Sequence, residues 1–318
     1  MSSMAARMTR SPRARLVETR RRGWVDPYGG LGAFDFIRHA PSPRVSAYVE
    51  HFWVVTWTDL AEPYEQRIVS HPTVNMIIGP DFHRIAGVIR GGFSHTMRGS
   101  GRILGARFRP GGFRPFLGGP VSELTGHFVE IGEMYGTAGA ALVEQVLAEP
   151  RPRSAVALTE TFLLGLGLGL GPEQDPLVEE VAALVATAES DVSVTRVDEL
   201  AARSGRSVRS LQRLFRDYVG VGPKWVIRRF RLHEAAERVR QGLGLAALAA
   251  ELGYTDQAHL TRDFTAAVGM PPAAYARLGS EARPGGHRES SPQHGSSGPE
   301  DAVLALDEFQ VRHEEIVQ

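Results

Sequence analysis

Two segments of this chain, residues 199–215 and 247–264, repeat one pattern. The first reads ELAARSGRSVRSLQRLF and the second ALAAELGYTDQAHLTRDF. Each has Leu-Ala-Ala, then a Gly six or seven residues before a Leu, and Leu-x-x-x-Phe at its end. Apolar residues three and four positions apart are typical of an amphipathic helix, and the Gly between them interrupts it. The repeat therefore predicts two helix-turn-helix units within an all-α region.

The turns of the two units differ in length by one residue. Gly205 and Gly253 supply the turn backbone, and Ser207 is placed to cap the second helix of the first unit. In the second unit, either Thr255 or Asp256 takes that place. The end of each turn thus predicts where the outward-facing helix begins.

The second helix of the first unit turns a polar face outward. Leu211, Leu214, Phe215 and Tyr218 form its apolar stripe. Helical periodicity then places four polar residues on the opposite face: Arg209, Gln212, Arg213 and Arg216. Arg forms paired hydrogen bonds with guanine O6 and N7, and Gln does so with adenine N6 and N7, in a major groove wide enough for a helix. An ordinary solvated, Arg-rich face is the alternative interpretation.

The equivalent helix of the second unit is less basic. Its expected outward residues are Ala258, Thr261, Arg262 and Thr265, with Gln257 and His259 beside them. The methyl groups of Ala and Thr suit the thymine methyl, and Arg262 can repeat the guanine contact. We therefore expect this unit to contribute less to recognition than the first.

A long helix, residues 224–241, is predicted between the units. Its about 18 to 20 residues would span roughly 27–30 Å, close to the roughly 34 Å between major-groove entries on one face of B-DNA. One chain would therefore reach two successive major grooves. Residues 196–240 hold 12 basic and 5 acidic side chains, which suits a polyanionic partner. Either a phosphate clamp or a solvated face explains the cations on or near this helix: Lys224, Arg228, Arg229 and Arg231.

Residues 177–278 resemble the C-terminal DNA-binding domain of the AraC/XylS family of bacterial transcription regulators, which has two helix-turn-helix units joined by a long helix. The resemblance is carried by LAARSGRSVRSLQRLFRDYVGVGPKWV, RFRLHEAAERV and LAAELGYTDQAHLTRDFTAAVGMPPAAY. It implies base contacts by Arg209, Gln212 and Arg213 in the first unit and by Gln257, Ala258, His259, Thr261 and Arg262 in the second. The cations expected to contact backbone phosphates are Arg216, Lys224, Arg228 and Arg229.

The N-terminal region has a different pattern. Between residues 44 and 119, short runs rich in β-branched and aromatic residues alternate with Gly, Pro and Asp, which predicts an antiparallel sheet or barrel. Helices are expected near residues 138–148 and 153–164, so this is an α+β domain. The region is similar to an uncharacterised sensor-type domain found ahead of AraC-type DNA-binding domains. An effector pocket in it would be lined by Trp53, Trp57, His71, Arg107, Phe108 and Arg109, unless these residues simply fill the core of the sheet.

The composition divides the chain into five parts. Residues 1–24, with seven Arg and one Glu, read as a disordered leader or as a basic arm on DNA, and residues 25–165 as a sensing or dimerisation domain. Alternating Leu and Gly followed by Pro mark a linker at 166–176, and the DNA-binding domain follows at 177–278. Residues 279–318 are expected to form a disordered spacer and an acidic tail.

The sequence also argues against several kinds of site. The chain has no Cys, and therefore no disulfide, thiolate metal site or Cys nucleophile. No run approaches the roughly 20 apolar residues that cross a bilayer, so we expect a cytoplasmic protein without a membrane contact. No nucleophile elbow, P-loop or dinucleotide motif is present, and the His residues of the N-terminal region lack metal-ligand spacing. We therefore expect no catalytic residue, metal or cofactor.

These patterns favour a ligand-responsive, sequence-specific DNA-binding transcription regulator. Its expected partners are promoter DNA, a small-molecule effector, a second copy of the chain and RNA polymerase. The main alternative is an enzyme in the N-terminal domain, with the DNA-binding module only targeting it. A third is a protein-interaction scaffold, which would have neither ligand nor operator affinity.

Overall fold

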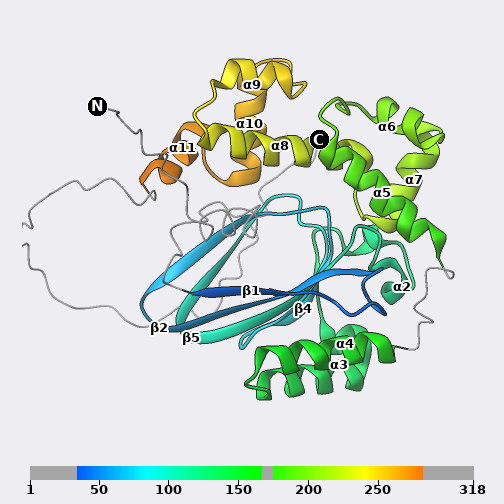
Figure 1. Cartoon of the computed structure of the whole chain (residues 1–318), viewed down its shortest axis with the longest axis vertical. Helices are drawn as coiled ribbons and strands as arrows, with labels where there is room; N and C mark the ends of the chain where they lie inside the picture. Colours follow the sequence, from blue (N-terminus) through cyan, green and yellow to red (C-terminus); the bar gives the residue numbers. More distant parts are fainter. Residues whose placement is uncertain (1–33, 167–174, 282–318) are drawn as a thin grey trace, which may run out of the picture.

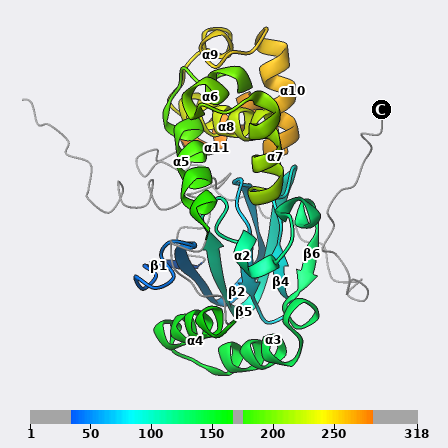
Figure 2. The same ribbon diagram turned by 90° about the vertical axis from the view of Figure 1, so that its right-hand side faces the viewer.

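The computed structural model describes residues 34–166 and 175–281. An antiparallel sheet and the helices α3 (Ile131–Ala148) and α4 (Pro152–Gly165) are followed by a region of helices alone (Figure 1). The helical region lies at one end of the sheet, and α3 and α4 lie at the other (Figure 2). The predicted architecture, an α+β domain followed by an all-α domain, is confirmed. The predicted leader, most of the predicted linker and most of the predicted C-terminal spacer and tail lie outside the described residues.

The sheet has six strands in the order β1-β2-β5-β3-β4-β6, all paired antiparallel. They are β1 (Asp35–His39), β2 (Val49–Val69), β3 (Asn75–Ile78), β4 (His83–Ala86), β5 (Gly92–Phe108) and β6 (Phe128–Glu130). Among the described strands, β1 and β6 form the edges, so the sheet is open and not a closed barrel. The sequence pattern predicted strands only between residues 44 and 119, so it did not predict these two edge strands, which lie outside that range.

Side-chain alternation along β2 and β5 gives the sheet two different faces. Phe52 of β2 and Phe108 of β5 lie in the main core, which α3, α4, the short helix α2 (Arg114–Leu117) and the 3-10 helix η1 (Val121–Leu124) help to form. Val55 of β2 and Ile103 of β5 point to the other face and lie in a separate apolar cluster. The face opposite the main core is therefore only partly filled by apolar side chains.

Two glycines on β5 make room for two tryptophans on β2. In the strand register, Trp53 is paired with Gly105 and Trp57 with Gly101. A Cβ atom at Gly105 would lie 2.1 Å from the Trp53 indole, and one at Gly101 would lie 2.3 Å from the Trp57 indole. The indoles therefore occupy the space beside the strand that a side chain at these positions would fill.

The helical region contains two helix-turn-helix units on either side of one long helix. Its helices are α5 (Pro176–Ser190), α6 (Val197–Ser204), α7 (Val208–Tyr218), α8 (Pro223–Arg240), α9 (Leu245–Glu251), α10 (Gln257–Val268) and α11 (Pro272–Glu281). Asp175 starts α5, because its carboxylate accepts a hydrogen bond from the N–H of Leu177. The joining helix α8 has 18 residues and therefore spans about 27 Å. The two predicted helix-turn-helix units and the long helix between them are confirmed, and the long helix differs from its predicted bounds by one residue at each end.

The sheet and the helical region share two apolar cores. Val88, in the loop between β4 and β5, is fully buried among residues of α5, α6, α7 and α8. Val69, at the end of β2, lies in a second core with residues of α8, α9, α10 and α11. Each helix-turn-helix unit is therefore packed against a different part of the N-terminal domain.

Candidate nucleic-acid interface and ligand pocket

Glycine turns and polar caps fix where α7 and α10 begin. Gly205 follows α6 with φ of 65°, and Gly253 follows α9 with φ of 74°, a left-handed conformation that glycine adopts most readily. The Ser207 hydroxyl accepts a hydrogen bond from an N–H in the first turn of α7, at 3.2 Å. The Asp256 carboxylate does the same in α10, at 2.7 Å, so Asp256 and not Thr255 is the cap. Both turns therefore have the chemistry that the sequence predicted.

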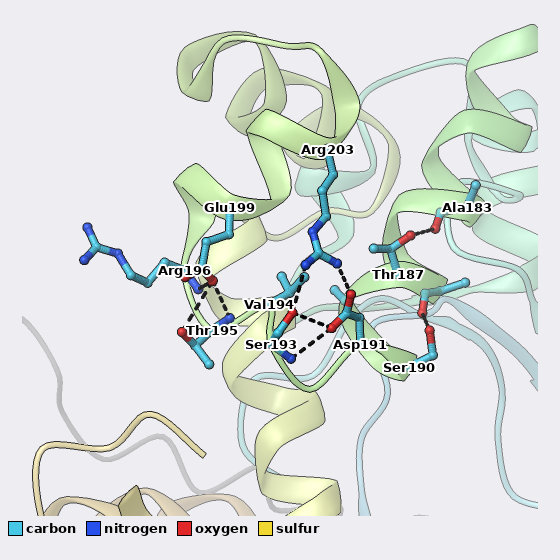
Figure 3. A network of polar contacts seen from close by, with 12 residues as sticks. Ala183, Thr187, Ser190, Asp191, Ser193, Val194, Thr195, Arg196, Glu199 and Arg203 are labelled. Atoms are coloured by element: carbon cyan, nitrogen blue, oxygen red, sulfur yellow. Dashed lines mark hydrogen bonds and ion pairs between the residues drawn. The ribbon is translucent and has the colours of Figure 1, made fainter. Parts of the chain in front are cut away.

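A polar network holds the loop between α5 and α6 (Figure 3). The Asp191 carboxylate accepts hydrogen bonds from the N–H and hydroxyl of Ser193, at 2.9 and 2.7 Å, and pairs with Arg203 of α6. Glu199 of α6 accepts a hydrogen bond from the N–H of Thr195 at 2.7 Å. These contacts fix α6 against the end of α5 and so orient the first unit.

One exposed face of α7 carries four polar side chains. They are Arg209, Gln212, Arg213 and Arg216. Together with Ser207 and Ser210, they line one concavity of the surface, which we call the α7 concavity. Within the described part of the chain, no ion pair or side-chain hydrogen bond engages the three guanidinium groups. They are therefore available to an anionic partner.

The exposed face of α10 carries less charge. Its predicted readers divide into exposed and half-buried side chains: Gln257, Ala258 and Arg262 are exposed, whereas His259 and Thr261 are half-buried. His259 packs edge-on against Tyr254, with ring centroids 5.2 Å apart. Asp263 adds a negative charge 3.9 Å from the His259 ring nitrogen Nε2. The second unit therefore presents a weaker positive surface than the first.

The two outward helices lie on the same side of α8, with α5 on the other side (Figure 2). Their C-terminal ends are near the N-terminal domain. Gly220, which follows α7, accepts a hydrogen bond from the Thr125 hydroxyl at 2.6 Å, and Ala267 of α10 lies beside Gly92. Their N-terminal ends are therefore the ends farther from this contact, and helix-turn-helix proteins direct that end of the helix at base edges.

The other cations near this surface are exposed at the start and middle of α8. Lys224 lines a second concavity of the surface with Arg216 and Gln212 of α7. Arg228 is exposed and pairs with Asp263 of α10, with its Nε 3.1 Å from the carboxylate. The structure thus brings Arg216 and Lys224 together and places Arg228 beside the second unit.

Arg229 is buried, and the prediction that it contacts the DNA backbone is wrong. Its exposed fraction is 3%, and burial lowers its pKa to about 10. The guanidinium lies 4.6 Å from the centre of the Trp225 ring and donates a hydrogen bond to the backbone carbonyl of Arg90 in the N-terminal domain. Arg231 is also 3% exposed and donates to two backbone carbonyls at the end of α5, each at 2.9 Å. Both arginines are buried because other elements pack against α8 on the sides where they lie. Arg229 joins α8 to the N-terminal domain, and Arg231 joins it to the end of α5.

A pocket lies on the face of the sheet opposite the main core. Three of the predicted pocket residues, Trp53, His71 and Arg107, line it. Much of the remaining wall is apolar, and its larger contributors are Phe36, Ile77, Phe82, Phe93 and Phe128. A mostly apolar cavity with a few polar groups is typical of a small-molecule site.

The other three predicted pocket residues lie elsewhere, so the prediction is wrong for them. Phe108 is fully buried in the main core, because strand alternation turns it to the opposite face of the sheet. Trp57 belongs to the apolar cluster on the pocket side and donates from Nε1 to the carbonyl of Arg98 at 2.9 Å. Arg109 lies past the end of β5 and donates to the carbonyl of Ser46 at 2.7 Å.

One part of the pocket wall is polar. Arg107 of β5 is paired in the sheet with His51 of β2 and with Asn75 of β3, and all three line the pocket. The Arg107 Nε lies 3.0 Å from the Glu50 carboxylate. Burial alone would raise the pKa of Glu50, but its hydrogen bond with His51 and the charge of Arg107 lower it to about 2. Burial lowers the pKa of the His51 imidazole.

Two known domain types match the chain. Residues 37–130 match a domain of unknown function, DUF6597, and residues 200–278 match a helix-turn-helix domain. The C-terminal domain is an AraC-type helix-turn-helix domain. The match supports a DNA-binding transcription regulator. No curated protein matches the sequence significantly.

Among solved structures, the chain is similar to ToxT from Vibrio cholerae. One ToxT structure has 11% sequence identity and a TM-score of 0.32, and the match covers 77% of this chain and 97% of ToxT. A structure of ToxT bound to (E)-4-(8-methylnaphthalen-1-yl)but-3-enoic acid has 8% identity and a TM-score of 0.35, with 77% and 98% covered. The likeness is distant, and the assignment of the AraC-type domain does not depend on it.

Several polar residues that line the pocket were not predicted. They are Arg38, His51, Gln66, Asn75 and His95. Alternation along β2 offered a signal for His51, which lies two residues from Trp53 and shares its face.

Within residues 34–166 and 175–281, no group of three His, Asp or Glu side chains is placed to hold a metal ion. No helix in these ranges has the length and apolar character needed to span a bilayer.

Proposed function

We propose that this chain is a sequence-specific transcription regulator whose α7 and α10 enter successive major grooves of one duplex. The observation that carries the proposal is the placement of both outward helices on the same side of α8 (Figure 2). The joining helix α8 spans about 27 Å, a length comparable to the roughly 34 Å helical repeat of B-DNA, and would hold the two helices apart. A single copy of the chain would then occupy two neighbouring grooves.

In this proposal, α7 supplies most of the base recognition. Arg209 and Arg213 would form paired hydrogen bonds with guanine, and Gln212 would do so with adenine. The second unit would add weaker contacts through Gln257, Ala258, His259, Thr261 and Arg262. Arg216, Lys224 and Arg228 would bind backbone phosphates, which fix the position of the protein without reading sequence.

Selecting bound fragments from random DNA with the purified full chain tests this proposal. We expect an enriched sequence with two parts centred about 10 base pairs apart, and protection of both major grooves on one face of the duplex. Arg213→Ala should relax the preference at one base pair. Arg98→Ala is the control, because Arg98 is an exposed arginine of β5 that lines neither the α7 concavity nor the pocket. The absence of an enriched sequence would contradict the proposal.

We also propose that a small-molecule effector binds in the N-terminal pocket. Its apolar part would contact Trp53 and Phe128, and a hydrogen-bond acceptor or acidic group would reach Arg107 and His51. The support for this is the chemistry of the wall, where large apolar side chains surround a few polar ones and the paired strands bring Arg107 and His51 together.

Two connections lead from the wall of this pocket to the joining helix. His71 lines the pocket and stacks on His233 of α8, with ring centroids 4.2 Å apart. Ile89 also lines the pocket and precedes Arg90, whose carbonyl accepts the hydrogen bond from Arg229 of α8. A ligand that shifts this wall would therefore act on the helix that sets the separation of the two units.

A small-molecule screen on the full chain, followed by Trp fluorescence, tests the effector site. Gly105→Ala should weaken binding of any hit by about tenfold or more, because the new Cβ would lie 2.1 Å from the Trp53 indole and displace it. Gly165→Ala is the matched control, since its Cβ meets nothing within 4 Å. Equal binding by both variants would place the ligand elsewhere. Chemical conversion of a hit would instead support the enzyme alternative.

The remaining parts of the proposal concern organisation and partners. We propose residues 25–165 as the sensing or dimerisation domain and 177–278 as the DNA-binding domain, with a leader at 1–24, a linker at 166–176 and a spacer and tail at 279–318. We also propose that the chain binds a second copy of itself, contacts RNA polymerase and is cytoplasmic. Sedimentation with and without operator DNA measures the number of copies bound.

A further inference from the structure

Arg90 lies where the sheet meets the helical region. It is exposed, it lies between β4 and β5, and it lines the same concavity as Arg216 of α7 and Lys224 of α8. Ser122 of η1 also lines this concavity. Three cationic side chains from the two domains therefore face one space, which we call the junction concavity.

The junction concavity is continuous with the exposed face of α7. Gln212 and Arg216 line both this concavity and the α7 concavity, which also contains Arg209 and Arg213. A helix inserted into a major groove has phosphates of both strands along its sides, and these phosphates receive many of the contacts in protein–DNA complexes. DNA read by α7 would therefore carry its backbone past Arg90.

The backbone of Arg90 is fixed, whereas its side chain is available. Its carbonyl accepts a hydrogen bond from the buried Arg229, and Val88, two residues earlier, is fully buried. Within the described part of the chain, no ion pair or hydrogen bond engages the Arg90 guanidinium. A cation on a fixed backbone loses less conformational freedom when it binds a partner.

We propose that Arg90, Arg216 and Lys224 form a phosphate-binding site across the junction, so that the N-terminal domain contacts DNA directly. This inference rests on the proposed function, because it requires α7 to lie in a major groove. It gives the N-terminal domain a part in DNA binding in addition to sensing. Ile89, the neighbour of Arg90, lines the ligand pocket, so an effector would act within one residue of this contact.

The test compares Arg90→Ala with the wild-type full chain by fluorescence anisotropy, using the selected operator at several salt concentrations. We expect affinity to fall roughly three- to tenfold and the slope of log K against log salt to decrease by about 0.9, as for the loss of one phosphate contact. The base preference should not change, because phosphate contacts do not read sequence. Arg90→Gln, a second neutral variant with a long polar side chain, should give the same change in slope, and Arg90→Lys should retain most of the affinity.

Arg98→Ala is again the control, as an exposed arginine of the same domain that does not line the junction concavity. The substitutions at Arg90 keep the carbonyl that accepts from Arg229, and a thermal melt of each variant checks the fold. Equal affinity and slope for Arg90→Ala and Arg98→Ala would overturn the site, as would a loss of affinity with an unchanged slope. If the wild-type chain binds no duplex at all, the proposed function itself fails, and the phosphate site fails with it.

Discussion

The two helix-turn-helix units have the same fold but differ in the charges that surround their outward helices. On α7, Arg209, Arg213 and Arg216 are exposed, and within residues 34–166 and 175–281 no acidic side chain is paired with them. On α10, Arg262 is the exposed cation of the predicted face, and Asp263 follows it directly. The first unit is therefore the stronger candidate for binding energy, and the second would mainly set the orientation of the protein on DNA.

The units also differ in how they contact the N-terminal domain. The first unit packs around Val88, two residues before Arg90, and the second packs around Val69 at the end of β2. The ligand pocket lies close to both contacts, because Ile68, Ser70 and Ile89 line it. One ligand would therefore reach the two units through different segments of the N-terminal domain.

The largest effect is expected for the phenylalanine that closes each repeat. Phe215 and Phe264 are both fully buried, and removal of such a ring leaves a cavity. We expect Phe215→Ala and Phe264→Ala each to lower the free energy of unfolding by about 3–5 kcal/mol in urea denaturation. Val208→Ala, at an exposed position of α7, is the control and should change it by less than about 0.5 kcal/mol. A much smaller loss at one Phe would show that the two units are not packed equivalently.

The next effect concerns the two exposed arginines of the predicted reading faces. Arg213→Ala should weaken specific binding by about 1–3 kcal/mol and relax one base preference, as expected for the loss of a paired contact with guanine. Arg262→Ala should cost less, because the exposed face of α10 carries fewer cations than that of α7. Both are measured against the selected operator and against unrelated DNA. An equal or larger effect at Arg262 would reverse the assignment of the units.

The success of sequence reasoning in this domain follows from local chemistry. Gly205, Ser207 and the repeated Leu and Phe spacing depend only on neighbouring residues, so they predicted both turns and the start of α7. The choice between Thr255 and Asp256 stayed open, because both have a side-chain oxygen that can cap a helix. The structure decided it through the hydrogen bond of Asp256.

Long-range packing is what the sequence did not predict. Arg228 and Arg229 are adjacent arginines on one helix, yet one is exposed and the other is buried against Trp225 and the N-terminal domain. Nothing within their local sequence tells them apart, because the difference comes from which side of α8 the sheet packs on. The pocket has the same difficulty, since β1, β2, β3 and β5 all contribute to it and only the strand order brings them together.

A smaller effect should separate the two contacts with the N-terminal domain. Val88→Ala and Val69→Ala each remove two methyl groups' worth of packing at a buried position and should cost about 1–2 kcal/mol. Hydrogen exchange should then show faster exchange in α7 for Val88→Ala and in α10 for Val69→Ala, because each valine packs in one unit's core. Ala47→Gly is the control, because Ala47 packs beside the main core and its change should affect neither helix selectively. Equal changes in both helices for either valine variant would mean that the units respond as one body.

The smallest effect is expected for the ion pair that ties each unit to a neighbouring helix. Arg206 pairs with Glu180 of α5 through two nitrogen atoms, at 2.5 and 2.6 Å, and Arg228 pairs with Asp263 of α10. Because these pairs are partly exposed, a double-mutant cycle should give about 0.2–1 kcal/mol for each. The two-point geometry at Arg206 predicts the larger value for the first unit.

The pair in the first unit should also depend on pH in a defined direction. The hydrogen bond from Arg206 lowers the pKa of Glu180 below its ordinary value of 4.5. Its contribution to stability is therefore fully present above pH 4.5 and is lost as the pH falls through the lowered value. Glu180→Gln should flatten the loss of stability in that acidic range, whereas Glu179→Gln, at the exposed neighbouring position, should follow the wild-type curve. If the two variants gave the same curve, the Arg206–Glu180 pair would not stabilise the first unit. The Arg228–Asp263 pair would then be expected to contribute more to stability.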